Sequence, residues 1–394
     1  MANIINLKPF KDFFKSESTG GVLLILCVVL SLIIANSSLG QAFADFLALN
    51  LGFDNGTIDL KYPVLLWIND GLMAIFFLMV GLEIKRELVE GELSSIKQAS
   101  LPIIAALGGM LIPALIYFSI DHSAETGHGW GIPMATDIAF AIAILSLLGS
   151  KVPNSLKIFL TALAIVDDLG AILVIAVFYS KEIHLAYLGY AAIVFAVLIA
   201  FNYFGVKKIY FYIIPGILMW YLIHHSGIHA TIAGVLTAFT LPTNDTSKVS
   251  PLERLEHILV KPVNFIIMPI FAIANTNIKF ESEMVTNITS SVSLAIICGL
   301  MIGKPVGILS FSWLAVKLKL SKLPPLAKWS QIAGLGLLGG IGFTMSIFIA
   351  LLSFNEVEYQ TQAKFSILIA SVSAGILGFV ILKYLGKNRK RVLM

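Results

Sequence analysis

Apolar runs about as long as a bilayer is thick recur along nearly the whole chain, and they constrain its fold more than any other feature. The chain is 58% hydrophobic and 13% charged, with a mean hydropathy of +0.90, values outside the range of soluble domains. A membrane-spanning helix needs ~20 such residues, and most of the runs approach that length. We therefore expect one all-α, multi-pass domain over residues 1–394, embedded in lipid and without a nucleic-acid partner. The runs are 20–36, 63–82, 99–120, 131–149, 156–180, 185–204, 209–224, 227–242, 258–275, 291–315, 332–353 and 363–385.

Lysines and arginines indicate how many of these runs cross the membrane. With twelve crossings and both termini cytoplasmic, 22 basic residues fall on the cytoplasmic side and 4 on the other, while Lys304 lies inside a run. Such a cytoplasmic excess is the usual pattern in membrane proteins, so we expect twelve helices. Residues 1–19 are polar and are not followed by a small-residue cleavage site, which predicts a retained cytoplasmic arm.

Residues 37–62 form a long external loop in this topology. Asn55-Gly56 lies there between short alternating runs, a pattern that favours a β-hairpin. A hairpin edge can pair with a second copy of the chain, so a homodimer through this loop is one expectation. An irregular loop without a dimer contact is the alternative.

Three of the apolar runs contain charged residues at depth. Asp167 and Asp168 lie near the middle of 156–180, where one carboxylate costs about 2.5–3.5 kcal/mol and a second repels the first. Asp137 follows Thr136 in the run 131–149, and Lys304 lies in the run 291–315. One lysine cannot neutralise three carboxylates. The surplus negative charge therefore predicts binding of protons or of a mobile cation.

Two of the runs contain signals for an interrupted helix. The run 131–149 opens with Gly131 and Pro133, and 332–353 holds five glycines in nine residues, each costing ~1 kcal/mol relative to alanine. A broken helix leaves dipole charge inside the membrane, which an acid neutralises at N-terminal ends and a base at C-terminal ends. Asp137 and Lys304 are available for these two roles.

The interrupted runs are the middle members of two helix triplets, approximately 99–180 and 291–385. The number of helices between the triplets gives them opposite orientations, which predicts an inverted-topology repeat with two interrupted, crossing helices. Broken helices at matching positions indicate a transporter site at the interface of the repeats. Sodium suits that site, because carboxylates and the Thr136 hydroxyl are hard oxygen ligands and no Cys or His lies near the aspartate pair. Asp167 and Asp168 point about 100° apart on a helix, so one can bind the ion while the other pairs with Lys304.

Seven stretches of the chain carry a family resemblance: WINDGLMAIFFLMVGLEIKREL, ATDIAFA, LKIFLTALAIVDDLGAI, SGIHATIAG, RLEHIL, GKPVGI and GIGFTMSIFIA. They resemble the NhaA-type sodium/proton antiporter family of bacterial inner membranes, over essentially the whole chain. This family is itself a known example of interrupted helices in an inverted repeat, so the repeat and the resemblance are not independent indications. The resemblance implies electrogenic export of Na+ or Li+ in exchange for external H+, activation at alkaline pH, and no cofactor.

The resemblance also assigns roles to residues. It implies that Asp168 and Asp167 bind the Na+ or Li+ ion and carry protons, and that Thr136, Asp137 and Lys304 support the site and the interrupted helices. It further implies a group for pH regulation: Glu83, Arg86, Glu87, Glu256, His257 and, near the opposite surface, His229. Taken without the resemblance, EIKRELVEGE is equally the solvated end of a helix.

Two other functions remain as alternatives. A sodium-coupled symporter of organic anions on a similar scaffold needs a larger cavity with several basic groups, and Lys304 is the only deep cation in the sequence. An intramembrane aspartic protease could use Asp137 and Asp168. Proteases of that kind carry a Gly-x-Gly-Asp arrangement, which this sequence lacks at its aspartates, so we expect a transporter and not an enzyme.

Overall fold

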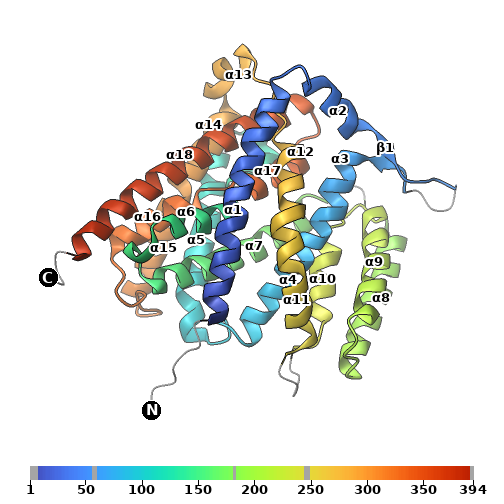
Figure 1. Ribbon diagram of the computed structural model, residues 1–394, viewed down its shortest axis with the longest axis horizontal. Coiled ribbons are helices and arrows are strands. Elements are labelled where there is room, and N and C mark those ends of the chain that lie inside the picture. The colour runs from blue at the N-terminus through green and yellow to red at the C-terminus, as the bar shows by residue number, and fades with distance from the viewer. Residues whose placement is uncertain (1–7, 56–59, 181–182, 244–248, 391–394) are drawn as a thin grey trace.

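The computed structural model describes residues 8–55, 60–180, 183–243 and 249–390, which are mostly helical (Figure 1). The α-helices are α1 Lys8–Ala35, α2 Gly40–Ala48, α3 Val64–Leu66, α4 Met73–Val89, α5 Ile96–Ile120, α6 Ile138–Leu147, α7 Asn154–Phe178, α8 Leu185–Tyr203, α9 Tyr210–His225, α10 Ile232–Thr240, α11 Pro251–Pro262, α12 Met268–Asn275, α13 Ser282–Thr286, α14 Ser291–Cys298, α15 Lys304–Lys317, α16 Trp329–Gly339, α17 Phe343–Ser353 and α18 Val357–Lys390. Short 3-10 helices are η2 Gly127–Met134, η3 Gly149–Lys151 and η5 Asn287–Thr289, and π-helical turns are η1 Trp67–Leu72, η4 Val263–Ile267 and η6 Gly299–Gly303.

Eight helical segments of the described chain are long and apolar enough to cross a membrane, or ten if each of two bent pairs counts as one span. These numbers support an all-α, multi-pass membrane protein. Two of the predicted runs correspond to short helices, α9 with 16 residues and α10 with 9. The run 227–242 therefore contains a helix too short to cross a bilayer alone, because the helix begins only at Ile232, after the turn that contains Ser226 and Gly227.

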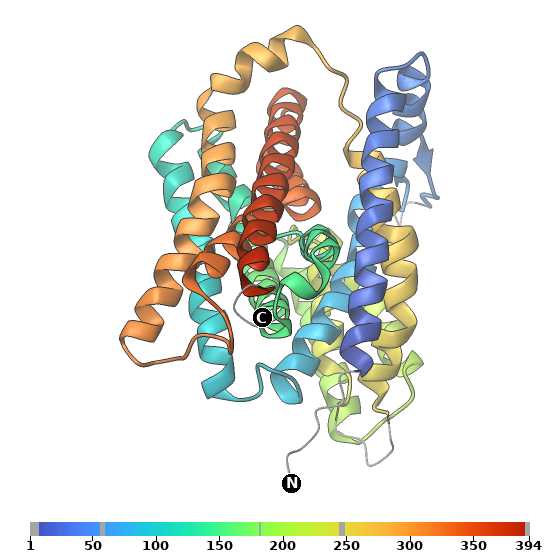
Figure 2. The same cartoon turned by 60° about the vertical axis from the view of Figure 1, so that its left-hand side comes forward.

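The N-terminal segment differs from the expected polar arm. Helix α1 begins at Lys8, so it includes most of residues 1–19, while residues 1–7 lie outside the described part. Pro9 falls in the first turn, where a proline is tolerated, and the next breaker is Gly20. The helix therefore extends well beyond its apolar part, and it lies beside α12 in both views of the molecule (Figures 1 and 2).

The external loop contains more structure than a simple hairpin. Helix α2 meets α1 at a bend of 107°, and the strands β1 (Asn50–Leu51) and β2 (Tyr62–Pro63) then pair antiparallel, with Asn50 opposite Pro63. The turn expected at Asn55-Gly56 falls partly on residues 56–59, which lie outside the described residues. The backbone of Gly52 has φ +115°, a conformation that favours glycine, and it packs against the carbonyl of Leu60.

Close packing of glycines positions the helix that carries Lys304. A Cβ atom on Gly307 of α15 would lie 2.1 Å from the carbonyl oxygen of Gly108 on α5, and a Cβ on Gly108 would lie 2.4 Å from that of Gly307. The two backbones thus touch, as small residues allow in membrane bundles. Lys304 begins α15, directly after the π-helical turn η6, and its side chain is fully buried against this crossing.

Candidate ion-binding site

The two interrupted helices meet at their breaks. Residues 135–137 are extended between η2 and α6, and α16 and α17 are bent by 48° around residues 340–342. The backbone N–H of Asp137 donates to the carbonyl of Ile341 (2.6 Å), and the Thr136 hydroxyl donates to that of Gly339 (2.8 Å). Each break therefore satisfies backbone groups that the other leaves free, which is required where no water is present.

Asp137 closes the N-terminal ends of two helices at once. Its Oδ1 accepts from the backbone N–H of Phe140 at 3.1 Å, so it is the N-cap of α6. Its Oδ2 accepts from the backbone N–H of Thr344 at 3.0 Å and from the Thr344 hydroxyl, in the first turn of α17. An acid at the N-terminal ends is the arrangement predicted for Asp137, and here one carboxylate serves both helices.

Asp167 and Lys304 form a buried ion pair. Lys304 Nζ donates to Asp167 Oδ2, and both side chains are fully buried. Thr136 lies beside the same carboxylate. The sequence predicted two possible roles for Lys304, compensation of helix C-terminal ends and pairing with an aspartate. The observed contact is the pairing with an aspartate. Away from water, each of these charges is stabilised mainly by the other. Loss of either partner therefore leaves an uncompensated buried charge, which destabilises the folded protein.

Asp168 differs from its neighbour in having no such partner. Its side chain is 4% exposed, and its Oδ1 makes no hydrogen bond within the described part of the chain. Asp167, Asp137 and Lys304 are near enough to act on its charge. An ionised carboxylate cannot remain in such a place without a counter-charge. A bound proton or cation at Asp168 would supply such a counter-charge.

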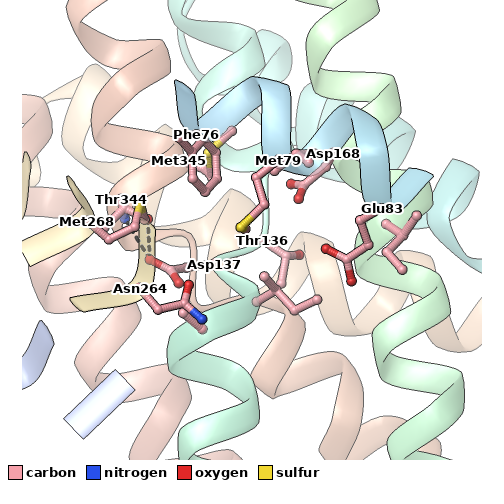
Figure 3. A pocket seen from close by; sticks show the side chains of 14 residues that line it. Phe76, Met79, Glu83, Thr136, Asp137, Asp168, Asn264, Met268, Thr344 and Met345 are labelled. Carbon is pink, nitrogen blue, oxygen red and sulfur yellow. Dashed lines mark hydrogen bonds between the residues drawn. The ribbon is translucent and has the colours of Figure 1, made fainter. Parts of the chain in front are cut away.

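A small cavity lies beside Asp168 (Figure 3). Its volume is about 30 Å³, room for about two water molecules. The polar side chains of its lining are Glu83, Thr136, Asp137, Asp168, Asn264 and Thr344, and the others are apolar. A space of this size suits an alkali ion with a remnant of its water, and it is too small for an organic anion.

The residues expected to regulate the protein by pH fall into two groups. Arg86 Nε donates to both oxygens of Glu256, at 3.1 and 3.0 Å, and Arg86 Nη1 pairs with Glu87 at 2.6 Å. The ion pair joins the end of α4 to α11, and His257 is near enough to act on the Glu256 charge. Glu83, one turn before Glu87 on α4, belongs instead to the lining of the Asp168 cavity.

His229 lies at the other end of α4. Its Nε2 is 3.4 Å from Oδ1 of Asp70, whose Oδ2 is 3.2 Å from Nδ1 of His224. Asp70 is in η1, 16 residues before Arg86, which corresponds to about 24 Å of helix. The structure thus separates His229 from the Arg86–Glu256 pair, and it places His229 with two residues to which the sequence analysis gave no role.

Two cavity residues, Thr344 and Asn264, were also missing from the predicted site. Thr344 follows the glycine-rich break, so its place in the first turn of the second half-helix was the available signal. Asn264 is an amide in the otherwise apolar stretch PVNFIIMP. The criterion applied to the aspartates, polarity inside an apolar run, would have found it had uncharged side chains been included.

Comparison with known proteins identifies the family. The family model described as Na+/H+ antiporter 1 matches residues 11–382. The chain is 64% identical to the Na(+)/H(+) antiporter NhaA 2 of Flavobacterium johnsoniae over 391 residues, 99% of this chain and 96% of the relative. It is 51% identical to the NhaA antiporter of Flavobacterium psychrophilum (96% and 97% covered) and 48% identical to that of Escherichia coli O1:K1 (95% and 97%). The chain therefore belongs to the Na+/H+ antiporter family, and it is a transporter rather than an enzyme.

Proposed function

We propose that sodium/proton exchange takes place at Asp168, which binds a sodium or lithium ion and protons in turn. The observation that carries this proposal is a buried carboxylate with an oxygen unbonded within the described chain, beside a cavity of about 30 Å³. A proton and a cation compete for the same oxygen, so the site holds one or the other. This competition couples the two fluxes.

Asp167 and Lys304 then form the second part of the site. When the Asp167–Lys304 pair opens, one of its members takes up a proton, and a cycle that moves more protons than sodium ions carries net charge. The exchange is thereby electrogenic and is driven by the membrane potential, with sodium leaving the cytoplasm and protons entering. The fully buried pair supports this assignment, since protonation of either group breaks it.

The test uses everted membrane vesicles with a respiration-driven pH gradient. Addition of sodium or lithium should collapse the gradient, potassium should not, and Asp168→Asn should abolish the response. Asp121→Asn, a buried aspartate outside the cavity lining, serves as the matched control and should retain exchange. Exchange that persists in Asp168→Asn would show that the ion binds elsewhere.

The arrangement in the membrane is the second part of the proposal. Twelve crossings, inverted repeats over approximately 99–180 and 291–385, and cytoplasmic termini in a bacterial inner membrane are supported by the excess of basic residues on one side. The contacts between the two breaks also support it, because they join the middle members of the two triplets. Reporter fusions that are active outside the cytoplasm, placed after Ile120 and after Ile278, should be active, and fusions after Val249 should not.

A homodimer through the external loop is the third part. The paired strands leave an outer edge, and Leu49, Leu51 and Phe53 beside it are exposed. Exposed apolar side chains on a strand edge favour pairing with a second copy of the chain.

The cytoplasmic pair Arg86–Glu256 carries the proposed pH regulation. It bridges two helices, α4 and α11, and α4 also supplies Glu83 to the cavity. A change in the charge of Glu256 or of its neighbour His257 would therefore act on the helix that lines the ion site.

A further inference from the structure

Helix α10 ends at carbonyl groups that bind side chains of two other helices. The helix has only 9 residues, and the last carbonyls of any α-helix have no partner within it. Lys85 Nζ of α4 donates to the carbonyl oxygens of Phe239 (2.7 Å) and Leu241 (2.6 Å). The Asn202 amide of α8 donates at 2.5 Å to the carbonyl between them, that of Thr240. A lysine is favourable at such an end, because its positive charge opposes the negative end of the helix dipole.

Lys85 is unusual among the charged side chains at this end of α4, because its partners are neutral. It is partly buried, and within the described chain it forms no ion pair, although Glu83 and Glu87 are each only two residues away. Burying an ammonium group is costly unless it is paired or hydrogen-bonded. Both of its acceptors belong to one helix end, so the interaction that offsets this cost attaches α4 to α10. The sequence predicted a base at a helix C-terminal end and offered Lys304 for it; at α10 this role belongs to Lys85.

Elsewhere α4 and α10 lie side by side and touch through small residues (Figure 1). A Cβ atom on Gly81 of α4 would lie 2.8 Å from Cβ of Ala238, and a Cβ on Gly234 of α10 would lie 2.3 Å from the carbonyl oxygen of Ala74. Contacts of this kind bring helices close together in membrane bundles. They have no preferred direction, so they resist separation of the helices more than sliding or rotation. The two hydrogen bonds of Lys85 are directional, and they fix the register of α4 along α10.

Helix α4 is also one wall of the cavity beside Asp168. The lining includes Phe76, Met79 and Glu83 of this helix (Figure 3). Glu83 precedes Lys85 by two residues, which is ~3 Å of rise along the helix. A change of register at Lys85 is therefore passed on to the wall of the cavity. The wall formed by the interrupted helices is held separately, by the hydrogen bonds between their breaks.

We propose that Lys85 is a positioning residue of the ion site, which sets the α4 wall of the Asp168 cavity by fixing the register of α4 against α10. The proposal rests on cation binding at Asp168. Lys85 acts through α4 and does not itself contact the ion. A cavity of about 30 Å³ has room for about two water molecules, so a small displacement of one wall changes how an ion fits. Loss of the lysine should therefore weaken ion binding more than it slows the transport cycle.

The test compares Lys85→Met with Lys85→Arg in everted vesicles. Lys85→Met keeps a long side chain and removes the donors. The KM for sodium should rise about three- to tenfold, the worth of one hydrogen bond, while the maximal rate stays within about twofold of the wild type. Lys85→Arg keeps the charge and several N–H donors, so its KM should stay near that of the wild type. Each KM is measured at the pH where that variant is most active, so that a shifted pH profile cannot imitate weaker binding.

The matched control is Asn202→Leu. The Asn202 amide serves the same end of α10, but it comes from α8, which lies outside the cavity lining. Its loss should lower the midpoint of thermal unfolding and leave the KM for sodium unchanged. Calorimetry of sodium binding to purified protein should likewise show a weaker affinity in Lys85→Met and not in Asn202→Leu. If Lys85→Met does not fold, Lys85→Gln, which retains a shorter donor, takes its place and should show a smaller rise of KM.

The outcomes separate this inference from the proposed site. A wild-type KM in folded Lys85→Met or Lys85→Gln would overturn the positioning role while leaving Asp168 as the ion site. An equal rise of KM in Asn202→Leu would also overturn it, because the effect would then come from the end of α10 and not from the register of α4. A rise in Lys85→Arg as large as in Lys85→Met would count against it in the same way. Exchange that survives Asp168→Asn would instead refute the underlying site.

Discussion

At the scale of single residues, three buried aspartates do three different things. Asp137 accepts three hydrogen bonds and caps two helices, Asp167 pairs with Lys304, and Asp168 lines the small cavity without an ion-pair partner in the described chain. The residue pattern predicted the role of Asp137 at helix N-terminal ends, but it could not show which of Asp167 and Asp168 pairs with Lys304. Those roles depend on which backbone N–H groups and which lysine reach each carboxylate, and that is decided by the breaks in the helices.

The ion pair leads to a prediction about charge movement. Replacement of both partners, Asp167→Asn with Lys304→Ala, removes the pair without leaving one charge alone in the membrane. We expect the double variant to keep some sodium/proton exchange while losing the dependence of its rate on membrane potential. Rates in proteoliposomes with and without a potassium diffusion potential measure this. An unaltered dependence would mean that the second proton is carried by other groups.

Removal of one partner should be more damaging than removal of both. Lys304→Ala alone leaves Asp167 buried without its cation, and breaking such a pair costs roughly 3–5 kcal/mol. We expect the single variant to unfold in detergent at a lower temperature than the double variant. Thermal unfolding followed by fluorescence tests this, and equal midpoints for the two would contradict a stabilising pair.

Glu256 leads to a prediction about pH. Glu256→Gln keeps the size of the side chain and removes the charge that pairs with Arg86 at 3.0 Å. We expect the pH at which exchange begins to shift, while the maximal rate is largely kept, because the ion site itself is untouched. Glu253→Gln, on the same helix in a capping box, is the control and should leave the profile in place. A profile unchanged in Glu256→Gln would remove this pair from regulation.

At the scale of elements, the breaks could be predicted and the π-helical turns could not. Glycine density and Pro133 predicted where the helices containing Asp137 and Thr344 are interrupted, since these residues disfavour a helix whatever surrounds them. The π-helical turns η1, η4 and η6 depend on packing between helices, and PVNFIIMP has no local signal for one. The shortness of α10 was likewise not predicted, because an apolar run does not reveal where its helix begins.

The shared cap at Asp137 predicts the stability of two helices together. Asp137→Ala removes the acceptor for the N–H groups of Phe140 and Thr344, so it should lower the free energy of unfolding by about 2–4 kcal/mol. Asp137→Asn retains one acceptor oxygen and should cost less. Thermal unfolding of the two variants provides the comparison. Equal losses would indicate that the charge, and not the capping, matters.

At the scale of the whole molecule, the external loop predicts an assembly. Deletion of residues 50–61 removes β1 and the residues that connect it to β2, while leaving α2 and α3 to be joined. We expect dimers to dissociate in gentle detergent, as seen by native mass spectrometry, with exchange by the remaining monomers retained. A dimer that persists would place the contact on other helices.

The hydrogen bonds between the two breaks have a consequence for transport as a whole. The extended backbone of residues 135–137 and the bend between α16 and α17 are joined by hydrogen bonds, and Asp137 ties both to their following half-helices. If one broken helix moved without the other, the hydrogen bonds between the two breaks would be lost, and the membrane interior offers these polar groups few other partners. We therefore expect the two interrupted helices to move as one rigid unit, so that the ion site changes sides of the membrane by displacement of this unit against α4 and α12.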